Sequence, residues 1–323
     1  MNRRTAIQQL ATFFLTTASL AEAQQLGKVP RIGYLSNGGR ESPNAEALRQ
    51  GLRALSYVEQ KNIAIEYRSA EGNIDRLPGL AAELVGLKVD IIFATGGAAA
   101  VAAKKATSTI PIIFVGSPDP VATGLVASLA RPGGNVTGFS SGAPGLDGKR
   151  LEIIKETVPR LTRVGFLWNP FYSSVSIKEI RSVGKELGVQ AQSLEVRNPD
   201  DIDRAFEAAT KAQVGALIVA QQSPITFNSK RIVELAAKRR LPAIYPDTPW
   251  IHDGGLMSYG PSSADSHRRA AVYVDKVLKG RPPSDLPVQQ PMKYELMINL
   301  KTAKALGLTI PPVVLMRAER VVK

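Results

Sequence analysis

The chain has 323 residues, of which 44% are hydrophobic and 21% are charged, and these values exclude a disordered or collagen-like chain. It contains no cysteine, which excludes disulfides, a thiolate metal site and a thiol nucleophile. The formal net charge is +13, but Lys and Arg are dispersed along the chain, so we expect a solvated basic surface and no nucleic-acid partner.

Residues 1–23 have the pattern of a cleavable export signal. Arg3 and Arg4 give a positive start, residues 11–21 are mostly apolar, and Ala21-Glu22-Ala23 is a small-x-small cleavage site. The apolar stretch is shorter than the roughly 20 residues of a membrane span, which favours export over anchoring. The arginine pair fits either general or twin-arginine export. We therefore expect a periplasmic protein, and not a lipoprotein because the lipid-bearing cysteine is absent.

From residue 31 onward, short apolar runs alternate with amphipathic segments. This alternation is typical of parallel strands joined by crossover helices. The runs are apolar throughout, as expected of strands whose sheet is covered by helices on both faces. The sequence predicts strands at 31–35, 63–67, 90–94, 111–115 and 136–139, and helices at about 43–56, 74–87, 97–107 and 120–130.

The second part of the chain repeats the first at an offset of about 130 residues, which is too long for a solenoid repeat. Residues 31–37 recur as 163–169, and residues 110–114 recur as 241–245. Such a duplication predicts two similar lobes with a cleft between them. In the second lobe we expect strands near 163–168, 190–196, 215–220, 242–245 and 256–258, and helices near 174–187, 200–212 and 228–239.

The remaining residues are too few to form a third domain. A helix is predicted at 263–279, a strand at 294–298 and a short helix at 300–306, and we expect this tail to complete the sheets of both lobes. The chain is expected to cross between the lobes near 139–142, 258–261 and 286–291. The predicted N-terminal lobe is then 30–138 plus 261–287, and the C-terminal lobe is 139–260 plus 288–323.

Polar loops follow the predicted strands of both lobes. In open parallel sheets, ligands bind beyond the carboxyl ends of the strands, so these loops are the candidate ligand site. Turn formation and helix capping are the alternatives, with Asp119 before Pro120 as an N-cap and Thr95-Gly96-Gly97 as a tight turn. The predicted ligand-binding residues in these loops are Ser36, Asn37, Thr95, Gly96, Gly97, Ser117, Asp119, Asn169, Gln221, Gln222 and Asp247.

The sequence gives little support for catalysis. Its two histidines, His252 and His267, form no triad or metal site, and no Gly-x-Ser-x-Gly elbow is present. His267 lies next to two arginines and is expected to face solvent. We therefore expect no catalytic residue, metal or cofactor, although Asp119 and Asp247 could act as an acid and base pair across the cleft.

Several segments resemble a known family. The substrate-binding family of ABC transporters that includes tryptophan- and tyrosine-binding lipoproteins is similar to this chain at residues 31–35, 110–114, 119–121, 129–138, 256–260 and 298–303, which include Arg-Pro-Gly-Gly-Asn-Val-Thr-Gly. The similarity runs from about residue 30 to the C-terminus. It implies a type I periplasmic binding protein: an α/β fold of two Rossmann-like lobes with parallel sheets, joined by a three-crossing hinge. The positions that match the family's cleft loops are Ser36, Thr95, Gly96, Ser117, Asp119, Asn169, Asp247 and Tyr259.

The resemblance also implies a function and partners. We expect a monomer that captures a small-molecule ligand and delivers it to an ABC permease and its ATPase. Known members hold an aromatic amino acid, and amino-acid-binding members tend to carry an acidic side chain after the central strand of the second lobe. This sequence has Gln221-Gln222-Ser223 there. A carboxylate, an amide or a neutral aromatic compound is therefore equally compatible with the site. A periplasmic sensor that signals to a receptor, and an enzyme that uses Asp119 and Asp247, are the alternative functions.

Overall fold

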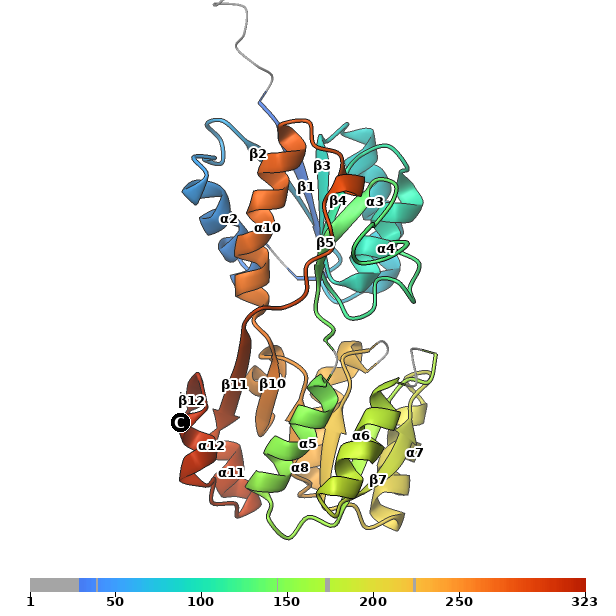
Figure 1. Ribbon diagram of the computed structural model, residues 1–323, viewed down its shortest axis with the longest axis vertical. Coiled ribbons are helices and arrows are strands. Elements are labelled where there is room, and N and C mark those ends of the chain that lie inside the picture. Colours follow the sequence, from blue (N-terminus) through green and yellow to red (C-terminus); the bar gives the residue numbers. More distant parts are fainter. Residues whose placement is uncertain (1–28, 39, 144, 172–174, 223–224) are drawn as a thin grey trace, which may run out of the picture.

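The computed structural model describes residues 29–323, except residues 39, 144, 172–174 and 223–224. The predicted export signal lies outside the described residues. Figure 1 shows two lobes, one above the other, with the chain passing between them at a narrow waist. Within the described part of the chain, none of the helices is both long enough and apolar enough to span a bilayer.

The N-terminal lobe is a five-stranded parallel sheet between two layers of helices. Its strand order is β2-β1-β3-β4-β5. Figure 1 shows α2 and α10 on one face of the sheet and α3 and α4 on the other. The bounds are β1 Arg31–Ser36, α2 Pro43–Ala54, β2 Ala64–Ser69, a 3₁₀ turn Ile74–Arg76, α3 Leu77–Gly86, β3 Ile91–Thr95, α4 Gly97–Ala106, β4 Ile112–Ser117, β5 Val136–Ser140 and α10 Ser263–Leu278.

The C-terminal lobe repeats this plan and adds two strands at one edge. Its strand order is β12-β11-β10-β9-β8-β6-β7. The bounds are α5 Leu146–Thr157, β6 Arg163–Trp168, α6 Val175–Glu186, β7 Gln190–Glu195, α7 Asp201–Lys211, β8 Ala216–Val219, α8 Ser229–Lys238, β9 Ala243–Tyr245, α9 Pro249–His252, β10 Met257–Pro261, β11 Tyr294–Asn299, α11 Leu300–Leu306, α12 Pro312–Met316 and β12 Arg320–Val322; the remaining 3₁₀ turns are Thr226–Asn228 and Pro283–Asp285.

The topology confirms the predicted fold class. The order β7-β6-β8-β9-β10 in the lower lobe is the counterpart of β2-β1-β3-β4-β5 in the upper lobe, as the duplicated sequence requires. Strands are apolar because helices cover both faces of each sheet, and Ile32, Phe166 and Ile218 are completely buried. Figure 1 shows β5 descending toward the lower lobe and β10 rising toward the upper one, so the carboxyl ends of the two sheets face each other.

The hinge consists of three crossings. The first follows β5, the second joins β10 to α10, and the third runs from residue 286 to β11. The third crossing pairs with β5, because the amide of Gln289 donates to the carbonyl oxygen of Gly138 (2.9 Å) and its carbonyl oxygen accepts from the amide of Ser140 (2.8 Å). The tail therefore adds a short segment to the upper sheet and two full strands to the lower one.

The elements that differ from the sequence-based expectation include a turn region, a helix and the direction of a strand. Residues 120–130 form turns instead of a helix, because Gly124 adopts a left-handed conformation (φ 67°) and the amides of Leu125 and Val126 both bond to the carbonyl oxygen of Pro120. Helix α5 was not predicted, because Gly145 and Gly148 hide its start. β11 runs antiparallel to β10, since the chain enters β11 from the hinge and must run away from it.

Helices α2 and α10 approach each other closely at Gly51. A Cβ atom at this position would lie 2.3 Å from the carbonyl oxygen of Arg268. We expect Gly51→Ala to force the two helices apart and to lower the free energy of unfolding by about 1–3 kcal/mol, which urea unfolding measures.

Gly79→Ala is the matched control, because nothing lies within 4 Å of a Cβ atom at this position of α3. It should raise the free energy of unfolding by about 0.4–1 kcal/mol, since alanine restricts the unfolded chain more than glycine does. Equal unfolding midpoints for the two variants would contradict the close contact between α2 and α10.

Candidate functional site

A cavity of 360 Å³ lies between the lobes, next to the hinge. The upper lobe contributes the loop after β4, and the lower lobe contributes α5, α6 and the loop after β8. The volume suits a small organic molecule. Its lining residues are Pro118, Asp119, Pro120, Val121, Leu129, Ser140, Ser141, Gly142, Ala143, Leu146, Asp147, Arg150, Ser176, Glu179, Ala220, Gln221, Gln222 and Gln290.

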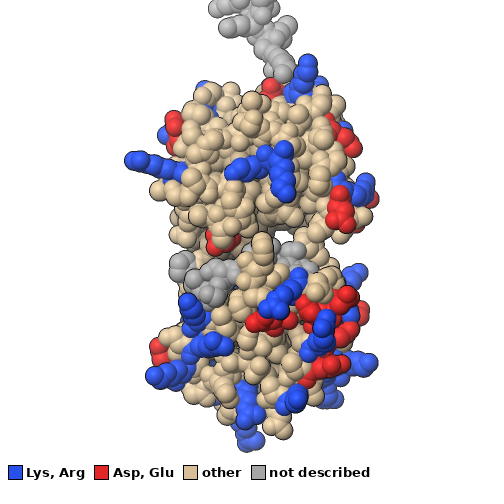
Figure 2. Space-filling view, turned by 90° about the vertical axis from the view of Figure 1, so that its right-hand side faces the viewer, with Lys and Arg blue, Asp and Glu red and all other residues tan. Residues whose placement is uncertain are grey.

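The cavity is acidic although the protein is basic. Asp119, Asp147 and Glu179 line it together with one cationic side chain, Arg150, which gives the lining a formal charge of 1 − 3 = −2. The chain as a whole carries +13. Figure 2 shows Lys and Arg spread over both lobes, with acidic side chains among them. The negative cavity is therefore a local feature, and it favours a ligand with a positive group.

The three carboxylates of the cavity differ in how far their charges are already engaged. Asp147 forms an ion pair with Arg150, and Glu179 accepts hydrogen bonds from the amides of Gly145 and Gly148. Asp119 accepts from the amide of Ala122 through Oδ1 (2.9 Å). Among the described residues no basic side chain lies within ion-pair distance of Asp119. Its Oδ2 atom is therefore the cavity oxygen best able to accept a bond from a cationic ligand.

Arg150 fixes the wall of the cavity in the lower lobe. Its side chain is only 3% exposed. The guanidinium donates through Nε to the carbonyl oxygen of Tyr259 (2.8 Å) and through Nη2 to that of Pro246 (3.3 Å). Arg150 thus ties α5 to the loop after β9 and to β10. No sequence signal indicated this role, because α5 itself was not predicted.

Asp247 lies behind the lining, beside Gln221. The Gln221 Nε2 atom donates to Asp247 Oδ2 (3.2 Å), whereas Asp247 Oδ1 is buried and has no hydrogen-bond partner among the described residues. Burial raises the pKa of Asp247 from 3.8 to about 6, against the lowering effects of the nearby Arg150 charge and of the Gln221 hydrogen bond. Asp247 therefore places an acidic group next to Gln221.

The first crossing contributes a hydroxyl that the sequence analysis missed. Ser141 lines the cavity, and its Oγ atom is buried without a hydrogen-bond partner among the described residues. The crossing is pressed against the loop after β4, since a Cβ atom at Gly142 would lie 2.0 Å from the carbonyl oxygen of Pro118. This close packing holds Ser141 at the cavity, where its hydroxyl can bond to a polar ligand group.

The structure brings the predicted ligand-binding residues of the lower lobe close to the cavity. Gln221 and Gln222 line it. Asn169, Asp247 and Tyr259 lie directly behind lining residues: the amide of Asn169 donates to Gln222 Oε1 (2.8 Å), and the other two contact Gln221 and Arg150.

Of the predicted ligand-binding residues in the upper lobe, only Asp119 lines the cavity, and it also caps a turn, as the alternative interpretation expected. Ser36 donates to the carbonyl oxygen of Gly38, and Asn37 Oδ1 accepts from the amide of Gly72 (3.0 Å), so both stabilise turns. The remaining predicted residues of this lobe lie at strand ends outside the cavity lining: Thr95, Gly96, Gly97 and Ser117.

The prediction that His267 faces solvent is wrong. Its side chain is 1% exposed and packs against Phe93, with 5.8 Å between the ring centroids. Nδ1 donates to the carbonyl oxygen of Ser263 (2.7 Å), which leaves Nε2 to accept from the hydroxyl of Thr95 (3.3 Å). Burial lowers the pKa of His267 to about 4, so the imidazole is neutral at neutral pH.

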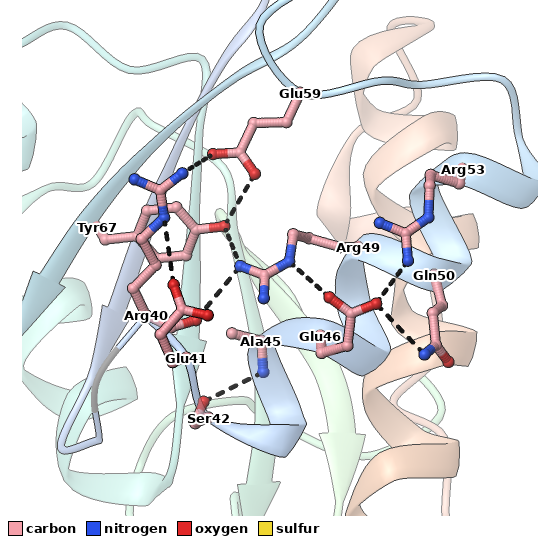
Figure 3. A network of polar contacts seen from close by, with 10 residues as sticks. All are labelled: Arg40, Glu41, Ser42, Ala45, Glu46, Arg49, Gln50, Arg53, Glu59 and Tyr67. Atoms are coloured by element: carbon pink, nitrogen blue, oxygen red, sulfur yellow. Dashed lines mark hydrogen bonds and ion pairs between the residues drawn. The ribbon is translucent and has the colours of Figure 1, made fainter.

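The loop after β1 is held by the polar network in Figure 3. Arg49 of α2 donates to the carbonyl oxygen of Arg40 (3.3 Å) and to the Tyr67 hydroxyl (3.1 Å), and Arg40 forms an ion pair with Glu59 (3.2 Å). These contacts join the loop to α2 and β2. Ser42 completes the arrangement by capping α2 through the amide of Ala45.

Within the described residues no group of His, Cys, Asp and Glu side chains could hold a metal ion.

Two lobes of like topology, a three-crossing hinge and a polar cavity at the facing strand ends define a bilobed solute-binding protein. The chain belongs to the ABC transporter substrate binding protein family, whose model matches residues 39–322. This match confirms the resemblance found in the sequence. Members of the family bind solutes and are not enzymes, which argues against Asp119 and Asp247 as a catalytic acid and base pair.

Individual relatives agree with this assignment. The chain is 27% identical over 274 residues to a tyrosine-binding protein from Clostridioides difficile strain R20291, covering 83% of this chain and 79% of the relative. Among solved structures, a conserved domain protein from Vibrio cholerae is 29% identical, with a TM-score of 0.78 over 91% of this chain and 100% of that chain. An ABC domain from Streptococcus pneumoniae in complex with L-Trp is 26% identical, with a TM-score of 0.76 over 90% of this chain and 100% of that chain.

Asp247 and His267 make stability depend on pH in opposite directions. Folding raises the pKa of Asp247, so the folded state binds more protons between pH 3.8 and about 6, and stability falls as the pH rises through that window. Folding lowers the pKa of His267 from 6.5 to about 4, so the unfolded chain binds more protons there, and stability rises with pH.

Removing either group should expose the effect of the other. In Asp247→Asn the free energy of unfolding should rise between pH 4 and pH 6 more steeply than in the parent, by at most about 1.4 kcal/mol per pH unit. In His267→Gln the difference in the free energy of unfolding between the variant and the parent should decrease as the pH rises over the same range. Urea unfolding at several pH values measures both slopes, and parallel curves for all three proteins would contradict the pKa assignments.

Proposed function

We propose that the protein is the periplasmic solute-binding component of an ABC importer. It captures an amino-acid-like molecule, with an ammonium group and an apolar or aromatic side chain, in the cavity between its lobes. It then delivers this solute, as a monomer, to a membrane permease and its ATPase. Family membership supports the transport role, and the tyrosine and L-Trp named for two relatives support the ligand class.

The negative charge of the cavity carries the ligand assignment. In a chain of charge +13, three carboxylates and one guanidinium surround the cavity. The ligand ammonium pairs with Asp119, the one carboxylate of the three that has neither a basic partner nor two backbone donors among the described residues. The Ser141 hydroxyl donates to the ligand carboxylate.

Apolar side chains complete the site from both lobes. Pro118, Pro120, Val121 and Leu129 come from the upper lobe, and Leu146 comes from the lower lobe. A flat apolar side chain of the ligand fits between such surfaces, while a few polar groups fix its orientation. Because the ligand touches both lobes, it binds the closed form better than the open form and shifts the population toward closure.

Asp119→Asn tests the pairing with the ammonium. The variant keeps Oδ1, so it can still accept the bond from the Ala122 amide, but it loses the negative charge. We expect L-tyrosine or L-tryptophan, whichever the parent binds, to bind the variant roughly 10-fold to 100-fold more weakly, because a hydrogen bond to a charged group contributes about 1.5–3 kcal/mol. Isothermal titration calorimetry measures the difference.

Asp75→Asn is the control, because Asp75 is an exposed acid on the same lobe and does not line the cavity. It should bind as the parent does. Unchanged affinity in Asp119→Asn, with the fold intact, would remove Asp119 from the ligand site.

Export is tested by the mature N-terminus. When the full chain is expressed in a Gram-negative host, we expect it in the osmotic-shock fluid, with Gln24 as its first residue. Mass spectrometry of the shocked-out protein gives the cleavage site directly. Retention of residues 1–23 on a cytoplasmic or membrane-bound protein would contradict both the cleavable signal and the periplasmic location.

A further inference from the structure

A second cavity, here called the hinge cavity, lies on the upper lobe beside the third crossing. It measures 360 Å³ and is bounded by Phe139, by α10 and by residues 281–289. Figure 1 shows α10 and the segment that follows it side by side in front of β5. Three cationic side chains and one acidic side chain line the cavity, which gives it a formal charge of 3 − 1 = +2: Arg269, Lys276, Arg281 and Asp285.

The two cavities lie on opposite sides of the same hinge strands. Ser140 lines the cavity between the lobes, whereas its neighbour Phe139 lines the hinge cavity. Gln290 and Gln289 divide in the same way on the third crossing. Side chains of adjacent residues in an extended strand point to opposite faces. The two paired hinge segments therefore have one cavity on each face.

The cations of the hinge cavity are poorly neutralised. The Arg269 guanidinium lies 5.3 Å from the centre of the Phe139 ring, and its Nη1 atom is buried without a hydrogen bond to any described residue. The carboxylate of Asp265 forms an ion pair with that atom at 3.7 Å, which neutralises part of its charge but is too long for a hydrogen bond. Neither Lys276 nor Arg281 forms an ion pair with any residue that the structure describes.

Tyr273 marks the centre of this positive region. Its hydroxyl donates to the carbonyl oxygen of Pro287 (2.6 Å) and accepts from Gln289 Nε2 (3.1 Å). Burial raises the pKa of Tyr273, and the charges of Arg269 and Arg281 both act to lower it. Arg269 from the middle of α10 and Arg281 from the segment after this helix therefore line the same cavity as Tyr273.

We propose that the hinge cavity is a second ligand site, for a phosphate group. Planar guanidinium groups bind two oxygens of a phosphate at once, and a dianion would satisfy the buried N–H of Arg269 while neutralising the net charge of +2. The volume leaves room for a small organic group on the phosphate. Val272, Leu286 and Pro287 offer apolar surface for it.

The test is calorimetric titration with two probes at constant ionic strength. Inorganic phosphate represents the free anion, and phenyl phosphate represents a monoester with an apolar group. We expect saturable one-to-one binding of at least one probe. Direct titration is needed because phosphate also stabilises folded proteins in general by exclusion from their surface, so a higher melting temperature alone is not diagnostic.

The variants separate the site from general effects. Arg269→Gln and Arg281→Gln should each weaken binding about 10-fold or more, since each removes a charge-assisted contact. Arg160→Gln, an exposed arginine outside the hinge cavity, should bind as the parent does. Asp119→Asn should also bind phosphate as the parent does, so the outcome is independent of the solute site.

Arg281 is exposed, so Arg281→Gln keeps the proposal testable even if Arg269→Gln does not fold. The absence of saturable heat with both probes would overturn the site. Equal affinities in Arg281→Gln and Arg160→Gln would overturn it as well.

Discussion

Two backbone hydrogen bonds at the waist organise the whole molecule. They join Gln289 to Gly138 and Ser140, so that the third crossing runs beside the end of β5. Because the crossing is paired there, the loops after β4 and β8 face each other across the cavity between the lobes at a defined separation. Without this pairing, unpaired hinge segments would link the two lobes. The cavity-lining residues of one lobe would then have no fixed position relative to those of the other.

The electrostatics of the molecule follow from where its charges are buried. Most of the basic side chains stand in solvent, where water screens them. The three carboxylates around the cavity are partly buried, so their field reaches the ligand with less screening. A protein with a positive surface can therefore still select a cation in its cleft. The same reasoning applies in reverse to the hinge cavity, where guanidinium groups exceed their acidic neighbours.

Much of the fold could be predicted from the sequence, because the apolar runs of buried parallel strands are strong local signals. The repeat of residues 31–37 at 163–169 correctly indicated two lobes with the same strand order. The failures lie where glycine and proline are dense. Residues 120–130 have helix-like apolar spacing but form turns, and α5 begins directly after Gly145 and contains Gly148 in its first turn, so its start has no clear helix signal.

The site was less predictable than the fold. Strand-end position correctly placed Asp119, Gln221 and Gln222 at the cavity, but it could not show that the loops after β1 and β3 stay outside its lining. That depends on how the lobes approach each other, which no local pattern encodes. Ser141 and Arg150 were missed because one lies in a crossing and the other on the unpredicted helix. A serine followed by glycine within the predicted crossing at 139–142 is the signal that could have identified Ser141.

The central claim is that an ammonium group is recognised between the lobes, and comparing an amino acid with its N-acetyl derivative tests it most directly. Calorimetric titration of the unmodified protein with L-tyrosine, L-tryptophan and their N-acetyl forms separates the amine from the rest of the ligand. The account predicts saturable binding of at least one free amino acid and a loss of affinity of roughly one to two orders of magnitude on acetylation, since the charged contact between the ammonium group and Asp119 is then lost. Equal binding of the free and acetylated forms would contradict it.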